Sequence, residues 1–393
     1  MYKYDFETVV DRSNAGSFKW TSMINKGITG VVPLSVADME LKNAPEIIEG
    51  LKDYLDKTIL DYTGPTDSYW DSVINWVKKQ HNATVTKEDI TITQGVVAAI
   101  DLAVKAFTKE NDGIIIFNPV YYPFGMTINK NNRKLVNVPL LEKEDNFTPD
   151  FEAFEKACKD PDNKMLIFCS PHNPIGRIWS REELVKIHQI ALENDVIIVS
   201  DEIWWDFYYS EQKRHVSALE LDEKYALNTI VCTSPSKTFN LAGMRISNIF
   251  IKDHAKKEIY DQVASTYNQG QAHMLSYKAV ELAYNESYDW YQECLKLIHD
   301  NYLTIKKWFE EKYPKITVCE LTGTYLLWID FRCLGLNNED LEAMMLKAKI
   351  VTDEGYLFGE EGSGYERINL ACPKHVITDT LDRLDEVLKD YYK

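Results

Sequence analysis

The segment KMLIFCSPHNPIGRIWSREELVKIHQIALENDVIIVSDE, residues 164–202, carries a complete strand–helix–strand pattern. Its two apolar runs, at 164–169 and 195–200, are hydrophobic on successive residues, which is typical of strands buried on both faces of a sheet. Between them, Ser180 and Glu183 have the spacing of a capping box and predict the start of a helix. Two strands joined in this way are expected to be parallel members of a sheet that helices cover.

The same alternation of apolar runs and helical stretches extends on both sides of this segment. The stretch 96–107 places Ile100, Val104 and Phe107 on one stripe, as in an amphipathic helix. Further strand-like runs are DITIT (89–93), GIIIF (113–117), TIVCTS (229–234) and ISNIFI (246–251). The sequence therefore predicts an α/β fold with a mostly parallel central sheet covered by helices.

The C-terminal third has a different pattern and predicts a smaller α+β unit. Long helices are expected around 274–312, and two strand-like runs follow at 315–321 and 324–331. The last helix has its apolar stripe at Leu381, Leu384, Leu388 and Tyr391. We expect a large domain over residues 46–285 and a small domain over 286–393, to which the N-terminal segment 1–45 is added.

The composition excludes several classes of protein. The 393 residues are 45% hydrophobic and 27% charged, as in globular proteins, and carry a net charge of −17, which disfavours nucleic acid and anionic lipid as partners. No apolar run reaches the length of a membrane span, and the polar N-terminus predicts no signal peptide, so a cytoplasmic location is expected. The seven scattered cysteines form no CxxC pair and the histidines no HExxH motif, which predicts buried free thiols and no metal site.

Polar and aromatic residues follow the apolar runs, at the strand ends where open α/β sheets bind ligands. Taken singly, each has an ordinary explanation as a turn, a helix cap or a solvated side chain. Taken together, they are complementary to an aromatic, phosphorylated aldehyde. The residues are Gly95-Val96, Tyr121-Tyr122, the loop 170–176 with Asn173, Asp201-Glu202, and Lys237 between hydroxyl side chains.

Each of these residue types has a partner in pyridoxal 5′-phosphate. A lysine amine forms a Schiff base with an aldehyde, and an aspartate pairs with a protonated pyridine nitrogen. Serines, backbone amides and an arginine hold a phosphate, while an aromatic ring stacks on the heterocycle. The combination predicts pyridoxal phosphate as the cofactor.

Longer motifs give the chain a resemblance to a known family. SPSKTFNLAGMR (234–245), PHNPIGRIWSREEL (171–184), VSDEIW (199–204) and NPVYYPF (118–124) resemble motifs of fold-type I enzymes of the class I/II aminotransferase family. RSNAGSFKW (12–20), PLSVADMEL (33–41) and YERINLACP (365–373) resemble the MalY/PatB branch, whose members are commonly cystathionine β-lyases or cysteine C–S lyases.

The resemblance implies a role for individual residues. Lys237 matches the Schiff-base lysine, Asp201 the partner of the pyridine nitrogen, Asn173 the ligand of the phenolic oxygen and Tyr121 the stacked ring. Arg367 matches the clamp for the substrate α-carboxylate. The implied phosphate-binding residues are Gly95, Val96, Ser234, Ser236, Arg245 and Tyr62, the last reaching the neighbouring subunit's phosphate, which implies a homodimer with shared sites.

Three residues depart from the pattern of the branch. Ser35 stands where the branch usually has tryptophan, Trp204 where it has histidine, and Asp61 where it has glycine. Ser35, Val36 and Trp204 are expected to line the substrate pocket, so that these departures affect the preferred substrate side chain. The lysine motif itself is intact.

The resemblance implies a carbon–sulfur β-lyase. Such an enzyme would eliminate a thiol or sulfide from cystathionine, cysteine or a related S-substituted cysteine and leave pyruvate and ammonia. An aminotransferase using the same lysine is the alternative, and a cofactor-binding regulator without turnover is another. A nicotinamide-dependent oxidoreductase would fit the alternating sheet, but the GxGxxG turn is missing.

Overall fold

A seven-stranded sheet forms the centre of the computed structural model, which describes residues 2–392 apart from the side chain of Glu211. Its order is β1-β9-β8-β7-β6-β2-β3. Strands β3, β2, β6, β7 and β8 run parallel, whereas β9 is antiparallel to both neighbours, so the predicted α/β class with a mostly parallel sheet is confirmed. The strands are β1 (Ile90–Thr93), β2 (Gly113–Ile116), β3 (Lys134–Asn137), β6 (Asn163–Cys169), β7 (Ile197–Asp201), β8 (Thr229–Thr233) and β9 (Ser247–Ile251).

Both faces of this sheet are buried except at the edge strand β3, as the continuous apolar runs of the other strands predicted. In β6, Met165 and Ile167 pack toward one set of helices, and Leu166 and Phe168 toward the other. Burying a side chain of this size contributes roughly 1.5–3 kcal/mol, so each face stabilises the sheet. The first set is α4 (Val96–Phe107), α5 (Pro123–Lys130) and α10 (His254–Thr266); the second is α6 (Phe151–Cys158), α7 (Arg181–Glu193) and α8 (Glu223–Ala226).

The capping box at the start of α7 forms as predicted. The Ser180 hydroxyl accepts a hydrogen bond from Glu183 N (3.2 Å), and the Glu183 carboxylate accepts one from Ser180 N (2.8 Å). Arg177 adds an ion pair to the same carboxylate (2.6 Å). The loop 170–176 therefore enters the helix at a fixed point, which also fixes the residues between β6 and α7.

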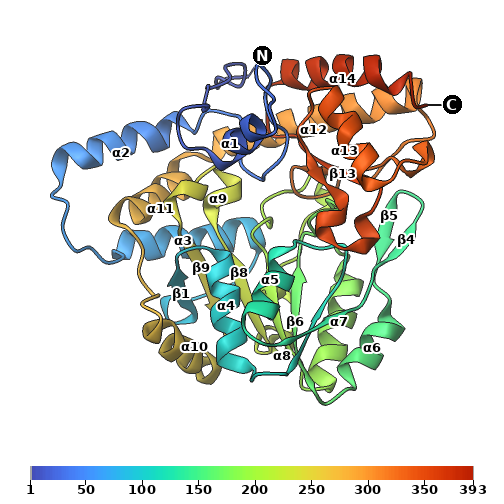
Figure 1. Cartoon of the computed structure of the whole chain (residues 1–393). Coiled ribbons are helices and arrows are strands. Elements are labelled where there is room, and N and C mark those ends of the chain that lie inside the picture. The colour runs from blue at the N-terminus through green and yellow to red at the C-terminus, as the bar shows by residue number, and fades with distance from the viewer. Residues whose placement is uncertain (1, 393) are drawn as a thin grey trace.

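The C-terminal part forms a separate antiparallel sheet in the order β10-β11-β13-β12. The predicted strands appear, and the long helices expected around 274–312 are two, which Ser287 separates. The elements are α11 (Met274–Glu286), α12 (Tyr288–Lys312), β10 (Thr317–Val318), β11 (Leu326–Asp330), α13 (Asn338–Lys347), β12 (Asp353–Glu354), β13 (Tyr365–Asn369) and α14 (Lys374–Leu388). A small hairpin of β4 (Leu141–Lys143) and β5 (Asn146–Thr148) lies beside this part (Figure 1).

The N-terminal segment lies against the C-terminal part (Figure 1). Leu34 N donates to Val351 O and Asn369 N to Leu34 O, both at 2.8 Å, and Glu40 N donates to Ala371 O at the same distance. These bonds support adding residues 1–45 to the unit of 286–393; the domain boundaries stay a prediction.

An ion cluster holds this segment in place. Lys19, on α1 (Phe18–Asn25), is fully buried and pairs with Asp38 (3.3 Å) and Glu40 (3.0 Å), which Arg12 also contacts. Breaking a buried pair of this kind typically costs about 3–5 kcal/mol, because the remaining charges lose their partners. The cluster therefore fixes residues 35–40, which lead into the functional site.

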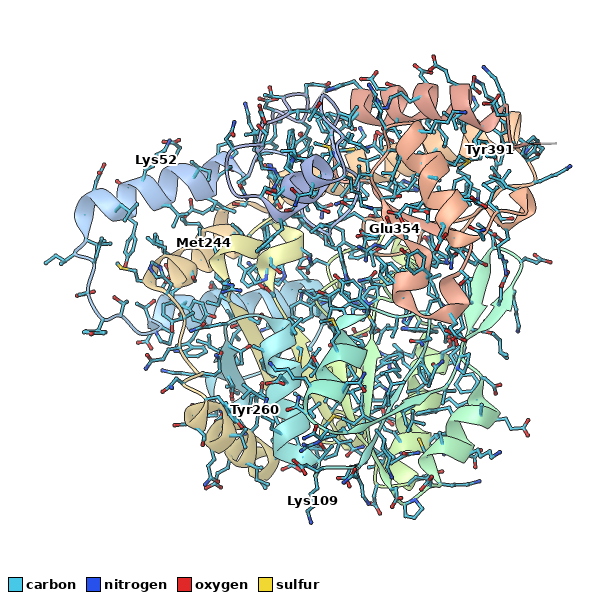
Figure 2. All side chains as sticks on the ribbon, in the orientation of Figure 1. Lys52, Lys109, Met244, Tyr260, Glu354 and Tyr391 are labelled. Atoms are coloured by element: carbon cyan, nitrogen blue, oxygen red, sulfur yellow. The ribbon has the colours of Figure 1, made fainter. Side chains whose placement is uncertain are left out.

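Helix α2 (Pro45–Lys57) projects from the body of the molecule, and a loop connects it to α3 (Asp67–His81) (Figure 1). Lys52 marks this helix among the side chains drawn in Figure 2. None of the helices in residues 2–392 combines the length and the apolar character that crossing a bilayer requires. All seven cysteines are free and six are buried; the prediction of buried thiols is wrong for Cys333, which is exposed on a short turn after β11.

Candidate active site

Lys237 lies directly after β8, on the single-turn helix α9 (Pro235–Thr238). Its Nζ donates a hydrogen bond to Ala37 O (2.6 Å) and lies over the indole ring of Trp204, 5.4 Å from the ring centroid. Burial lowers the pKa of Lys237 to about 8, because desolvation disfavours the charged amine. An amine with this pKa has a substantial neutral fraction near pH 7 to 8 and can act as a base or a nucleophile.

Asp201 is the last residue of β7 and is buried. One carboxylate oxygen accepts a hydrogen bond from Ile203 N (3.1 Å), and no ion pair to Asp201 is found in residues 2–392. Burial raises the pKa of Asp201 to about 7. A buried carboxylate of this kind is suited to a cationic partner such as a protonated ring nitrogen.

Arg367, on β13, joins the two units at the site. Its Nη1 donates to Asn173 Oδ1 (2.7 Å), Nη2 to the carboxylate of Asp353, and the guanidinium lies 4.6 Å from the ring centroid of Phe358. Its Nε is buried and has no hydrogen-bond partner among residues 2–392. A buried, immobilised guanidinium with a free donor is a suitable binding group for a carboxylate.

Tyr121 lies between these charged groups. Tyr121 N donates to Asn173 O (3.1 Å), and both Asp201 and Arg367 are close enough to act on the hydroxyl electrostatically. Burial raises the pKa of Tyr121 to about 12, so the hydroxyl stays protonated at neutral pH. The structure thus brings Lys237, Asp201, Asn173, Tyr121 and Arg367 together, although they come from both units.

Two of the predicted phosphate-binding residues, Gly95 and Val96, lie at the N-terminal, positive end of α4. Gly95 opens this helix with φ 111°, a conformation that favours glycine, and its missing Cβ leaves space above the first turn. Arg245 is exposed in a left-handed conformation (φ 48°). The Ser234 hydroxyl is engaged internally, since it accepts from Ser236 N (3.1 Å) and donates to Ile246 O (2.7 Å), so it shapes the turn.

Met244, the residue before Arg245, is fixed to α11. Figure 2 shows Met244 beside this helix, where the Ser276 hydroxyl donates to Met244 O (2.6 Å). This bond anchors the turn that carries Arg245.

The residues expected to line the substrate pocket have different environments. Ser35 is buried and its hydroxyl has no hydrogen-bond partner, whereas Val36 is partly exposed with φ 41°. Trp204 is buried and packs edge-on against Tyr325, with 4.6 Å between ring centroids. Of these residues, the structure brings Trp204 directly to Lys237.

Tyr62 lies apart from the other predicted residues. It is fully exposed on the loop between α2 and α3, and no hydrogen bond or ring contact to another predicted site residue is found in the described chain. Ile59 (78% exposed) and Leu60 (74%) lie on the same loop.

Sequence reasoning missed several residues that contact the predicted ones. Ala37 and Asp353 accept hydrogen bonds from Lys237 and Arg367, and Tyr325 donates to Ala37 O (2.8 Å). Ala37 acts through its backbone, which leaves no signal in the side chain. Asp353 lies on a two-residue strand that the apolar pattern cannot identify.

The fold is that of fold-type I enzymes, which depend on pyridoxal 5′-phosphate, as the sequence predicted. The chain belongs to the family of class I and II aminotransferases, whose model matches residues 29–384. It is 35% identical over 386 residues to cystathionine β-lyase PatB of Bacillus subtilis (strain 168). The matched region covers 98% of this chain and all of that protein.

Two further comparisons support the same family. Protein MalY of Escherichia coli (strain K12) is 26% identical over 375 residues, covering 94% of this chain and 95% of that protein. The crystal structure of cystalysin from Treponema denticola, which contains pyridoxal 5′-phosphate, has a TM-score of 0.96 and 47% identity, covering 98% of this chain and 99% of that chain.

The residues present fit the cofactor. Asp201 supplies a buried anion for the ring nitrogen, and Lys237 supplies an amine of lowered pKa for the aldehyde. The first turn of α4 and Arg245 supply donors for the phosphate. Asn173 and Tyr121 supply an amide and a ring beside them.

Replacing Asp201 with asparagine tests the burial of this carboxylate. Because the folded pKa is about 7 and an unfolded aspartate titrates near 4, the folded state binds the proton more tightly and stability falls as pH rises between these values. Cofactor-free Asp201→Asn should therefore gain stability relative to the parent protein as pH rises from 5 to 8, by about 2–3 kcal/mol. Urea unfolding of the full-length chain measures the difference.

The control for this experiment is Asp56→Asn, which removes an exposed carboxylate on α2. It should follow the parent protein at both pH values. An Asp201→Asn protein that gains no stability between pH 5 and pH 8 would contradict the assignment of a buried carboxylate without a cation.

Proposed function

We propose that the chain is a carbon–sulfur β-lyase acting on cystathionine, cysteine or a related S-substituted cysteine. The observation that carries this proposal is the placement of an amine of lowered pKa, Lys237, between a buried carboxylate and a buried guanidinium. Those three groups match the three needs of an α-amino acid reacting through pyridoxal phosphate. The 35% identical relative named cystathionine β-lyase supports elimination as the outcome.

The chain's own residues have distinct tasks. Arg367 binds the substrate α-carboxylate, and Asn173 and Asp353 orient its guanidinium for this task through Nη1 and Nη2. Such binding places the substrate Cα near Lys237, whose neutral amine takes the Cα proton. Asp201 keeps the cofactor's ring nitrogen protonated by pairing with its positive charge.

When bound, the cofactor supplies an aldehyde that bonds amines and a ring that accepts the electron pair left at Cα. The bond from Cβ to sulfur would then break: sulfur would keep the electron pair of that bond, and the pair at Cα would form the Cα–Cβ double bond. Lys237 would give the proton it has taken to the leaving thiolate, and water would complete the release of pyruvate and ammonia. The ring of Tyr121 would lie against the cofactor ring, and Trp204 covers the amine of Lys237 from one side.

Elimination and amino transfer share these residues, so product analysis is the direct test. The purified protein should release pyruvate and a thiol from cystathionine or an S-substituted cysteine, and should transfer little amino group to a keto acid. The two rates are measured in parallel on the same preparation. Efficient amino transfer without pyruvate release would overturn the proposal in favour of an aminotransferase, and cofactor binding without either reaction would favour a regulator.

Lys237→Ala removes the amine on which the proposal depends. We expect activity to fall by about 10³-fold or more, because both the attachment of the cofactor and the proton transfer are lost. The visible absorbance of the bound cofactor should disappear as well. Lys109→Ala is the matched control, because Lys109 lies after the far end of α4 and is exposed (Figure 2); retention of absorbance and activity in Lys237→Ala would refute the assignment.

We also propose a homodimer in which Tyr62 reaches the phosphate of the partner subunit. The exposed side chains of Ile59, Leu60 and Tyr62, on a loop beside the projecting α2, support an interface at this place (Figure 1). The cytoplasmic location expected from the sequence stays a prediction.

Mixing two inactive variants tests the shared site. Tyr62→Ala and Lys237→Ala should each be far less active than the parent protein. After subunit exchange of an equal mixture, half of the dimers are mixed and each has one complete site, so about one quarter of the parent activity should return. No recovery, or a fully active Tyr62→Ala protein, would contradict the shared site; self-exchange of each variant alone is the control.

A further inference from the structure

The backbone at residues 36–38 forms a tight turn against Lys237. Asp38 N donates to Val36 O (2.9 Å), which closes a three-residue turn around Ala37. Val36 has φ 41°, a left-handed conformation that is costly for a β-branched residue. Such a conformation persists only where the surroundings hold it, and it is common at functional sites.

Two residues of the C-terminal sheet hold this turn. Val36 N donates to the carboxylate of Asp353 on β12 (3.0 Å). Asn369, at the end of β13, is buried, and its amide nitrogen donates to Val36 O (2.8 Å) and to Asp38 O (2.7 Å). A side-chain amide has two N–H donors, and Asn369 donates both to the carbonyl groups that flank Ala37.

The Ala37 carbonyl is thereby left to face the lysine. Its oxygen accepts from Lys237 Nζ (2.6 Å) and from the Tyr325 hydroxyl (2.8 Å). The Asn369 carbonyl oxygen is fixed in turn by Ala371 N (2.9 Å), so the amide cannot exchange its two ends. All three carbonyl groups of the turn therefore have partners that favour this orientation.

We propose that Asn369 is a positioning residue for Lys237: it holds the turn 36–38 so that the Ala37 carbonyl, with Tyr325 beside it, receives the lysine amine whenever that amine is not bonded to the cofactor. The inference rests on the proposed role of Lys237. The turn 36–38 also connects Lys237 with Arg367, the proposed ligand of the substrate α-carboxylate. The Asp353 carboxylate accepts hydrogen bonds from both Val36 N and Arg367.

Besides the Ala37 carbonyl, several charged groups act on the protonation of the Lys237 amine. Asp38 and Asp201 favour the ammonium form, while burial, Arg367 and Lys19 oppose it. A carbonyl oxygen at hydrogen-bond distance favours the ammonium form further. Loss of the Ala37 contact should therefore make the amine easier to deprotonate, while the charges around it stay in place.

The test uses the full-length apoprotein and pyridoxal 5′-phosphate. Only the neutral amine attacks the aldehyde, so the rate at which visible absorbance appears should rise as pH passes through the pKa of Lys237. In Asn369→Leu the midpoint of this pH profile should lie about one pH unit lower, the size expected when a charged group loses a hydrogen bond. The midpoint reports the environment of the amine, which a general loss of stability would not shift.

Asn301 of α12 provides a matched control. It is buried, and its amide nitrogen likewise donates to two carbonyl groups, of Leu370 (3.0 Å) and Cys372 (2.9 Å), but it does not contact the turn 36–38. Asn301→Leu should keep the midpoint of the parent protein. If the leucine variants do not fold, Asn369→Ser and Asn301→Ser serve instead, since serine leaves room for water at the carbonyl groups.

The outcomes separate this inference from the proposed function. An unchanged midpoint in the Asn369 variants, or an equal shift in the Asn301 variants, overturns the positioning role alone. A parent protein that gains no visible absorbance, or that borohydride reduction labels at another lysine, overturns the role of Lys237 and the inference with it. A lowered midpoint confined to the Asn369 variants supports the proposal.

Discussion

Burial of the parallel strands on both faces is the constraint on which the rest of the structure depends. In β7 and β8 almost every residue is buried, so a polar side chain within these strands needs a hydrogen-bond partner inside the protein, as Ser200 and Thr233 have. Polar groups therefore emerge at the strand ends. Because the strands run parallel, the ends of β6, β7 and β8 meet at one edge, where Asn173, Asp201 and Lys237 become neighbours although more than sixty residues separate the first from the last.

The edge of the central sheet supplies only part of the candidate site. Residues of the N- and C-terminal segments supply the rest. The buried ion cluster around Lys19 fixes residues 35–40, and β13 contributes Arg367 and Asn369 from the other side. The bond from Arg367 to Asn173 joins the C-terminal sheet directly to the loop after β6. The proposed carboxylate-binding arginine and the proposed Schiff-base lysine thus depend on contacts with three distant parts of the chain.

The large domain could be predicted well from the sequence because its signal is local. Each apolar run became a strand, and Ser180 with Glu183 fixed the start of α7. Strands β3, β4, β5, β12 and β13 were missed: the first four are short and largely polar or exposed, and the apolar residues of β13 (YERIN) are interrupted by charged ones. Their place in the fold is set by pairing with neighbours, which leaves no periodic pattern in the residues themselves.

The same distinction, between local sequence patterns and pairing of distant segments, applies to the residues of the candidate site. Asp201 and Lys237 were identifiable because they directly follow buried strands. The contacts of Asn369 with the turn 36–38 were not, because they join residues more than 330 positions apart and end on backbone carbonyl groups that any residue type provides. Motif resemblance drew attention to both segments but gave no reason for their pairing.

The relative sizes of two opposing effects on the pKa of Lys237, burial and the nearby indole ring, explain why this amine can serve as a base. Its pKa of about 8 lies below the ordinary value of 10.5, which corresponds to roughly 3 kcal/mol in favour of the neutral amine. The indole of Trp204 acts in the opposite direction, but a cation over an aromatic ring gains only about 0.5–2 kcal/mol. The effect of burial on the pKa of Lys237 is therefore larger than that of the indole ring. The tryptophan that replaces the usual histidine of this branch leaves the lysine able to lose its proton near neutral pH.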